Sequence, residues 1–207
     1  MTSAMRAADW DRRWEERIAE GVREPSPALI AQVEGLPVGR ALDLACGAGR
    51  NAVWLAGHGW RVTGVDFSPV ALSEARRLAK EHGVHVDFVE ADVVGWDPPV
   101  DSFDLVCVMY LQLPEADRRA VFARAATALA PSGTVLVVAH DVANRTEGHG
   151  GPSNPAVLYG SDDVASDLEG LELELAERVR RPVETPDGVR TAIDLVVRAR
   201  RPAPARA

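Results

Sequence analysis

Lysine is almost absent from this sequence. Of its 23 basic residues only Lys80 is a lysine, and the formal net charge is −8. Proteins that bind nucleic acid through its phosphates need clustered positive charge, so this balance argues against a general nucleic-acid binder. The arginines near the end of the chain, Arg198, Arg200 and Arg201, are expected to lie on a solvated surface.

Cysteine and long apolar runs are also scarce. Cys46 and Cys107 each stand in an apolar, strand-like context, so we expect buried thiols and no disulfide. No spacing of possible ligand residues indicates a metal site. No apolar run approaches the roughly 18 residues of a membrane span, and the chain does not begin with a basic segment followed by an apolar one. We therefore expect a soluble, cytoplasmic protein without membrane partners.

Strand and helix patterns alternate through most of the 207 residues. This predicts an α/β fold with a doubly wound, mostly parallel sheet of seven strands. Pro186-Asp-Gly188 predicts a C-terminal antiparallel hairpin, and Pro131-Ser-Gly133 is expected to separate a helix from the next strand. The expected strands cover residues 40–45, 61–66, 85–91, 103–109, 134–140, 171–183 and 189–200. The expected helices cover residues 8–20, 27–34, 50–57, 69–82, 115–129 and 162–168.

The most informative stretch is Ala41-Leu-Asp-Leu-Ala-Cys-Gly-Ala-Gly-Arg-Asn-Ala-Val53, which predicts a buried strand, a glycine turn and a helix. Gly47 and Gly49 remove two side chains where the chain bends, so a ligand can lie against bare backbone and the N–H groups of a helix N-terminus. Such a turn suits a nucleotide-like ligand. Asp43 comes four residues before the first glycine, where its carboxylate can face a cation or an ammonium group.

Two further carboxylates end the next strands of the expected sheet, and ligands of doubly wound sheets lie across these strand ends. Asp66 follows Gly49 by 17 residues, close to the spacing of about 20 at which an acid reaches ribose hydroxyls. Asp92 can accept from an adenine amine while the Val93 amide donates to the ring. The alternatives are a helix cap for Asp66, before a helix with Ser68 as its N-cap, and a turn residue for Asp92.

These residues resemble the motifs of class I methyltransferases, which use S-adenosylmethionine. Asp43, Gly47 and Gly49 match the first motif, Asp66 the second and Asp92 the third. The resemblance covers most of the chain, and it implies S-adenosylmethionine as the methyl donor and S-adenosylhomocysteine as the product. Two branches resemble this sequence in these segments: tellurite-resistance methyltransferases at Cys46-Gly-Ala-Gly-Arg-Asn51, and thiopurine methyltransferases at Trp54-Leu-Ala56 and Val62-Thr-Gly-Val65.

The resemblance also implies a cofactor site and a small-molecule acceptor. Trp10-Asp-Arg-Arg-Trp14 is similar to the paired tryptophans of thiopurine methyltransferases, so Trp10 would cover the cofactor; the alternative is a helix with both aromatics in the core. Met109 stands where the thiopurine enzymes have arginine, so their substrate preference is not carried over. The full set of expected cofactor-binding residues is Trp10, Asp43, Ala45, Gly47, Gly49, Asn51, Asp66, Phe67, Asp92, Val93 and Met109.

His140 is the candidate general base, because it follows the fifth expected strand at the ligand edge of the sheet. A phenol, hydroxyl or ammonium acceptor needs a proton removed, whereas a thiolate, a chalcogen oxyanion or a halide does not. Asp141 is adjacent to His140, and neighbouring strand residues point to opposite faces, so it need not orient the imidazole. A structural hydrogen-bonding role for His140 is the alternative.

The polar segment 141–160 is expected to be a lid over the acceptor or a mobile loop. It is similar to the glycine-proline loop beside the acceptor pocket of thiopurine methyltransferases. By that resemblance His149 and Tyr159 line the acceptor site, with Gly150 and Gly151 as hinges. Tyr110, just beyond the fourth strand, is expected near the methyl group.

The length suits one domain with a full core, so residues 1–207 are expected to form a single domain. Its expected parts are an N-terminal helical cap (1–38), a cofactor-binding core (39–140), the candidate lid (141–160), a helix with the C-terminal hairpin (161–200) and a disordered tail (201–207). Two other functions fit parts of the sequence. The run Gly47-Ala-Gly-Arg-Asn-Ala52 also fits a dinucleotide-binding oxidoreductase, and a protein that only binds S-adenosylmethionine as a sensor or partner subunit is the non-enzymatic alternative.

Overall fold

The computed structural model describes residues 7–19, 21 and 24–203. Its contacts group the chain into two compact units, Met1–Asp97 and Pro98–Ala207. The single domain expected from the sequence stays a prediction.

The first unit contains three parallel strands and four helices among its described residues. Strand β1 pairs with β2, and β2 pairs with β3, so that Asp43 lies opposite Gly64 and Gly64 opposite Phe88. Nearly every residue of β1 and β2 is buried, as expected for parallel strands covered on both faces. The elements are α1 (Ala7–Ala19), α2 (Pro27–Val33), β1 (Arg40–Leu44), α3 (Arg50–Gly57), β2 (Arg61–Asp66), α4 (Pro69–Glu81) and β3 (Val86–Glu90).

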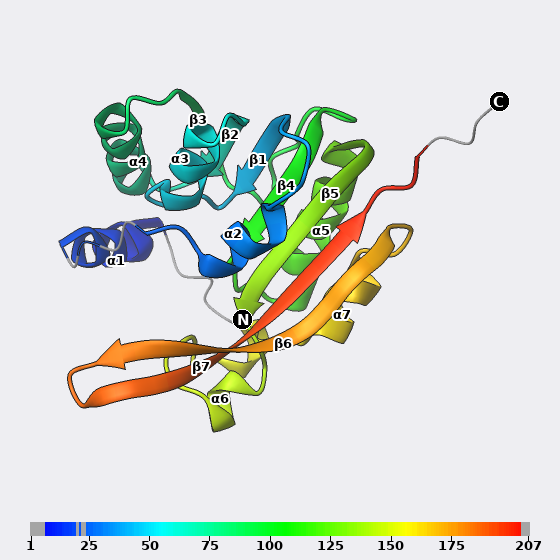
Figure 1. The fold of residues 1–207 in the computed structure, drawn as a ribbon. Coiled ribbons are helices and arrows are strands. Elements are labelled where there is room, and N and C mark those ends of the chain that lie inside the picture. Colours follow the sequence, from blue (N-terminus) through cyan, green and yellow to red (C-terminus); the bar gives the residue numbers. More distant parts are fainter. Residues whose placement is uncertain (1–6, 20, 22–23, 204–207) are drawn as a thin grey trace. The chain divides into compact units, whose positions relative to one another are not determined.

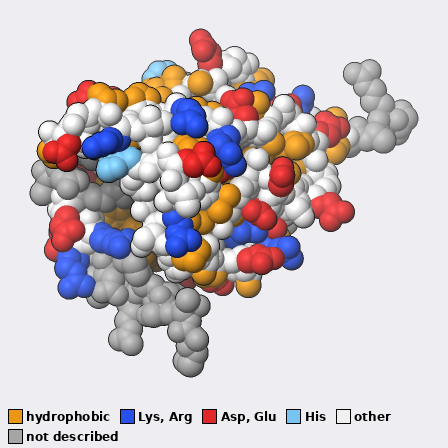
Figure 2. All heavy atoms as spheres, turned by 90° about the horizontal axis from the view of Figure 1, so that it is seen from below, with side chains coloured by type: hydrophobic (Ala, Val, Ile, Leu, Met, Phe, Trp, Pro, Cys, Tyr) orange, Lys and Arg blue, Asp and Glu red, His pale blue; other side chains and the backbone are white. Residues whose placement is uncertain are grey.

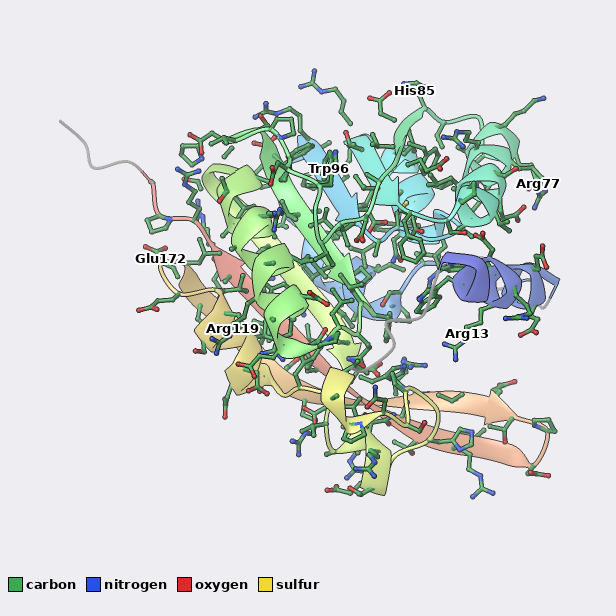
Figure 3. The ribbon with its side chains drawn as sticks, turned by 180° about the vertical axis from the view of Figure 1, so that it is seen from behind. Arg13, Arg77, His85, Trp96, Arg119 and Glu172 are labelled. Carbon is green, nitrogen blue, oxygen red and sulfur yellow. The ribbon has the colours of Figure 1, made fainter. Side chains whose placement is uncertain are left out.

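The second unit joins a parallel strand pair to an antiparallel hairpin. Strand β4 is parallel to β5, and β7 is antiparallel to both β5 and β6. Seen from behind, helix α5 lies across β4 and β5, with Arg119 on its outer side (Figure 3). The elements are β4 (Phe103–Met109), α5 (Glu115–Ala128), β5 (Leu129–His140), α6 (Asn144–Glu147), the short 3-10 helix η1 (Pro155–Val157), α7 (Ser161–Asp167), β6 (Glu172–Thr185) and β7 (Gly188–Arg200).

The C-terminal hairpin forms where the sequence predicts it. Strands β6 and β7 run side by side along their whole length (Figure 1), and the pairing closes at Thr185 and Gly188, with Pro186 and Asp187 as the two-residue turn. Gly188 has a φ of +110°, a value that a residue with a side chain rarely adopts. The Thr185 hydroxyl donates to the Gly188 carbonyl at 2.6 Å and fastens the turn.

Two details of this unit differ from the sequence-based expectation. Strand β5 begins at Leu129, not at residue 134, because Pro131-Ser-Gly133 makes an irregularity inside the strand: Leu129 lies opposite Phe103, and Thr134 is already opposite Leu105. The tail also starts later than expected. The backbone N–H of Arg201 donates to the Gly133 carbonyl at 2.9 Å, so Arg201 is held against the sheet; residues 204–207 lie outside the described part of the chain.

The strand order is β3-β2-β1-β4-β5-β7-β6. A mostly parallel seven-stranded sheet with a C-terminal antiparallel hairpin is the fold class that the sequence predicts, and it is confirmed. No helix in the described ranges has the length and apolar character needed to cross a membrane. Both cysteines are buried, as expected.

Candidate functional site

The glycine turn of the first unit bends the chain from β1 into α3. Ala45, Gly47 and Gly49 all have positive φ angles, of 58°, 55° and 78°, and Gly49 is the residue before the first turn of α3. A side chain at Gly49 would begin 2.7 Å from the Cβ atom of Ala75 on α4, closer than real Cβ atoms approach. The turn therefore depends on glycine both for its backbone angles and for the close approach of α4.

Asp43, next to the last residue of β1, is a buried carboxylate without a hydrogen-bond partner in the described chain. Its exposed fraction is 0%, and neither of its oxygens has a partner within the described part of the chain. Burial raises the pKa of Asp43 to about 7; the charge of Arg50 lowers it in part, and that of Asp66 adds to the increase. An unpaired carboxylate is costly to bury, so Asp43 is suited to receive a positively charged or hydrogen-bond-donating group from a ligand.

Asp66 connects the glycine turn to the end of β2. Its two oxygens accept from the backbone N–H groups of Gly47 and Ser68, each at 2.9 Å. Burial raises its pKa, and these backbone hydrogen bonds oppose the increase. The cap of α4 is Ser68 itself, whose hydroxyl accepts from Ala71 N–H at 3.1 Å. Helix capping therefore does not explain Asp66, whose carboxylate keeps acceptor capacity for a ligand hydroxyl.

The other expected cofactor residues of this unit differ in their exposure and in their hydrogen bonds. Asp92 is exposed and accepts from the backbone N–H of Val94 at 3.0 Å, which fits the turn role, while Val93 is buried. Asn51 is buried and accepts from Ser26 N–H at 2.9 Å, so it anchors the segment before α2. Ala45 and Phe67 are partly exposed.

Trp14, which is not among the residues expected from the sequence, meets the glycine turn at Gly47. A Cβ atom added to Gly47 would lie 2.4 Å from the Trp14 ring, so the ring lies directly on the turn. Trp10 is partly buried, with the guanidinium of Arg13 5.4 Å from its ring centre. Helix α1 is also tied to α4, because the Ser68 hydroxyl donates to Asp11 at 2.5 Å. The four-residue spacing of the two tryptophans was the signal for Trp14, since it gives them a shared helix face.

The second unit holds a separate polar cluster around Asp194 of β7. One oxygen of Asp194 lies 3.0 Å from His140 Nδ1; the other accepts from the Tyr110 hydroxyl at 2.9 Å and from Arg181 Nε at 2.7 Å. The rings of Tyr110 and His140 are tilted, with centres 5.3 Å apart. Antiparallel pairing places His140 directly opposite Asp194. Tyr110 has a φ of +58°, a strained value for a residue with a large side chain.

The cluster keeps Asp194 ionised. Burial alone would raise the pKa of Asp194, but hydrogen bonds from His140, Arg181 and Tyr110 lower it overall. Asp141 points away from this cluster, as strand alternation predicts: it accepts from Arg178 and from the backbone N–H of Ala143. The sequence analysis missed Asp194. The feature of the sequence that could have indicated Asp194 is that it is an acid in the otherwise apolar run Ala192-Ile-Asp-Leu-Val196.

Segment 141–160 contains short helical turns and is fastened to the second unit by Asn144. The amide of this buried residue accepts from Ile193 N–H at 2.7 Å and donates to the Gly150 carbonyl at 2.9 Å. Gly151 lies on the imidazole of His140, since a Cβ atom there would be 2.9 Å from ring atom Cδ2. The segment therefore packs on the polar cluster.

The two expected acceptor residues of this segment lie apart from the cluster. Tyr159 is only 1% exposed, and its hydroxyl donates to the Leu111 carbonyl at 2.5 Å, so the expectation that it lines an acceptor site is corrected to a core role. The Arg118 guanidinium covers its ring at 4.9 Å. The backbone N–H of His149 donates to the Thr191 carbonyl at 2.8 Å, beside the hairpin turn. Met109 is buried at the end of β4.

Comparison with known proteins assigns the glycine turn, Asp43 and Asp66 to a family. Residues 41–133 match the family described as methyltransferase domain. This stretch is a methyltransferase domain. The resemblance to methyltransferases is thereby confirmed, in place of the dinucleotide-binding oxidoreductase alternative.

Relatives of the methyltransferase domain agree with this assignment. The chain is 33% identical over 130 residues to demethylmenaquinone methyltransferase from Thermus thermophilus, covering 62% of this chain and 54% of the relative. It is 29% identical over 150 residues to thiocyanate methyltransferase 1 from Arabidopsis thaliana, covering 69% of this chain and 64% of that relative. The fold is similar to that of N-methyltransferase NodS from Bradyrhizobium japonicum in complex with S-adenosyl-l-homocysteine, with a TM-score of 0.66, 23% identity and coverage of 91% of this chain and 87% of that chain.

The methyltransferase domain does not include every candidate residue. The chain spans about half the length of the curated relatives it matches. Residues 41–133 contain Asp43, the glycine turn and Asp66, whereas Trp14, His140 and Asp194 lie outside the matched stretch. The roles of individual cofactor and acceptor residues stay predictions.

Proposed function

We propose that this protein is an S-adenosylmethionine-dependent methyltransferase that acts on a small-molecule acceptor. The observation that carries the proposal is the unpaired, fully buried carboxylate of Asp43 beside the glycine turn of a methyltransferase domain. In this proposal Asp43 receives the ammonium group of the cofactor, whose attraction for a buried carboxylate offsets the cost of burying the charge. Asp66 accepts from the ribose hydroxyls.

The residues present fit this cofactor. The glycine turn leads into the first turn of α3, whose backbone N–H groups can face a ligand, and Asp66 holds the turn in shape through the Gly47 N–H. Trp14, which lies on Gly47, is an aromatic surface for the ligand side of the turn. When bound, the cofactor supplies a reactive sulfonium methyl group, so the main tasks of the protein are to position the acceptor and to exclude water.

Two observations support a small acceptor. The relatives include proteins named for thiocyanate and for demethylmenaquinone, which are small molecules. The net charge is −8, and acidic, basic and hydrophobic side chains are interspersed over the face seen in Figure 2. A nucleic-acid acceptor would instead favour a concentrated basic surface. The cluster of His140, Tyr110, Arg181 and Asp194 is the candidate acceptor-binding region of the second unit.

Calorimetric titration with S-adenosylmethionine, S-adenosylhomocysteine and NADH in parallel tests the proposal. Micromolar binding of the first two and none of NADH is expected, followed by release of S-adenosylhomocysteine in a screen of small acceptors. Preference for NADH contradicts the proposal. Cofactor binding without turnover of any small acceptor favours the sensor alternative, and turnover only with RNA or protein contradicts the small-molecule part.

A further inference from the structure

Asp194 holds His140 in a defined orientation and proton state. The Nδ1 atom of His140 is the ring nitrogen that faces the carboxylate, at 3.0 Å. Because an ionised carboxylate only accepts hydrogen bonds, Nδ1 must carry the proton of the neutral imidazole. The other nitrogen, Nε2, then has a free lone pair, and it makes no hydrogen bond within the described ranges of the chain. The His140 side chain keeps 18% of its surface exposed, whereas that of Asp194 keeps 4%.

The neighbours of His140 fix this arrangement from several elements. Tyr110, after β4, and Arg181, on β6, both donate to the second oxygen of Asp194 and leave the first to His140. Gly151 of segment 141–160 packs on the ring. Of the titratable or charged groups in the described structure, Asp194 and Tyr110 contact the imidazole, and Arg181 contacts both of them. This is the arrangement of a general base whose partner fixes the tautomer and stabilises the imidazolium that forms.

We propose that His140 Nε2 removes a proton from the methyl acceptor, that Asp194 is its positioning residue, and that the acceptor is therefore a protic oxygen or nitrogen nucleophile. This inference rests on the proposed methyltransferase function. As the bond between the acceptor and the methyl carbon forms, the bond from that carbon to the sulfonium sulfur breaks and S-adenosylhomocysteine leaves. The acceptor proton moves to Nε2, and the imidazolium later returns it to water. An anion such as thiocyanate has no proton to give and would not need His140.

Nuclear magnetic resonance of the protein labelled with 15N-histidine tests the proton arrangement without turnover. At alkaline pH, where the imidazole is neutral, the His140 signal, assigned by its loss in His140→Gln, should show the proton on Nδ1. In Asp194→Asn the proton should move partly to Nε2, because the new amide can donate to Nδ1. A wild-type proton on Nε2 overturns the proposal, whether or not the protein binds S-adenosylmethionine.

Turnover of a panel of phenols, alcohols and amines, with thiocyanate and iodide as aprotic acceptors, tests the chemistry. With a protic acceptor, His140→Gln should lower kcat by about 10²- to 10⁴-fold and leave the acceptor KM and cofactor affinity within a fewfold of wild type. Asp194→Asn should lower kcat with a protic acceptor, because the tautomer with a free lone pair on Nε2 is no longer favoured. Unchanged kcat in His140→Gln, or turnover of the aprotic anions only, overturns the proposal.

Asp167→Asn is the matched control. Asp167 is a buried carboxylate of the same unit, with 1% of its side chain exposed, and Arg118 and Arg119 both donate to it. Its loss should lower the melting temperature in the way the loss of Asp194 does. It should leave the His140 tautomer unchanged, and an equal change of tautomer in Asp167→Asn would reduce Asp194 to a structural role. If calorimetry shows no binding of S-adenosylmethionine, the proposed function itself fails, and this result is distinct from the tests of His140 and Asp194.

Discussion

Asp43 of the first unit and Asp194 of the second are buried to nearly the same degree, with 0% and 3% of their surface exposed. Their pKa values nevertheless shift in opposite directions, because Asp43 has no hydrogen-bond partner while Asp194 accepts from three side chains. Burial alone therefore does not define the role of an acid. The unpaired carboxylate is available to a ligand, and the fully paired one orients its neighbour.

Replacing Asp43 should have the largest effect on cofactor binding. Asp43→Asn removes the charge that would meet the cofactor ammonium, so we expect affinity for S-adenosylmethionine to fall on the order of 100-fold, or about 3 kcal/mol. Calorimetry measures this change. The control is Asp87→Asn, since Asp87 is a carboxylate of the same unit with 70% of its side chain exposed, and it should leave affinity unchanged. Equal affinities in all three proteins would contradict the assigned role of Asp43.

The two acids should also give opposite dependences of stability on pH. The folded-state pKa of Asp43 is raised to about 7, so the folded protein binds a proton that the unfolded chain has released above about pH 4. Wild type should therefore lose about 2 to 3 kcal/mol of unfolding free energy relative to Asp43→Asn between pH 5 and pH 8. The folded-state pKa of Asp194 is lowered, so its stabilisation is present above the unfolded pKa and is lost as pH falls through the folded one.

Urea unfolding of wild type, Asp43→Asn and Asp194→Asn across this pH range separates the two cases. The advantage of wild type over Asp194→Asn should shrink only in the acid range, below about pH 4. If the unfolding free energies of wild type and Asp43→Asn changed with pH in parallel, Asp43 would titrate like an exposed acid. That result would remove the contrast with Asp194.

The difference between the two acids also explains how much the sequence could predict. Asp43 and the glycine turn follow one another from β1 into α3, and Asp66 ends the next strand, β2. Their grouping therefore depends on one strand–turn–helix–strand segment, whose geometry a short pattern encodes. His140 and Asp194 are 54 residues apart and meet through the pairing of β5 with β7. That register depends on tertiary packing, and spacing alone did not reveal it.

Contacts distant in sequence also explain where the structure differs from the expectations drawn from the sequence. Pro131-Ser-Gly133 has the composition of a break, yet pairing with β4 continues on both sides of it, so the strand includes it. Tyr159 stands in a polar segment, but its ring enters the core beside Arg118. Helix periodicity gave Trp10 and Trp14 one face without showing which ring meets Gly47. In each case contacts distant in sequence decided the outcome.

Asp66 should have an intermediate effect, because it combines a structural and a proposed binding role. Asp66→Ala removes the acceptors for two ribose hydroxyls and should cost about 1 to 3 kcal/mol of affinity for S-adenosylmethionine. Asp87→Asn is its control: it neutralises an exposed carboxylate of the same unit and should change neither the affinity nor the unfolding free energy. Calorimetry and urea unfolding of both variants measure the two quantities, and unchanged affinity in Asp66→Ala would mean that the ribose assignment is wrong.

The smallest expected effect tests how segment 141–160 contacts His140. Gly150 and Gly151 have nearly equal φ angles of 75° and 78°, but only a side chain at Gly151 would meet the His140 ring, at 2.9 Å; one at Gly150 would enter open space. Gly150→Ala should cost about 1 kcal/mol of unfolding free energy for the left-handed backbone, measured by urea unfolding, and Gly151→Ala should cost more because its side chain also has to displace the ring. Only Gly151→Ala should also displace the His140 nuclear magnetic resonance signal. If both variants displace it equally, backbone strain alone reaches the imidazole, and the direct packing of Gly151 on His140 is not what holds the ring.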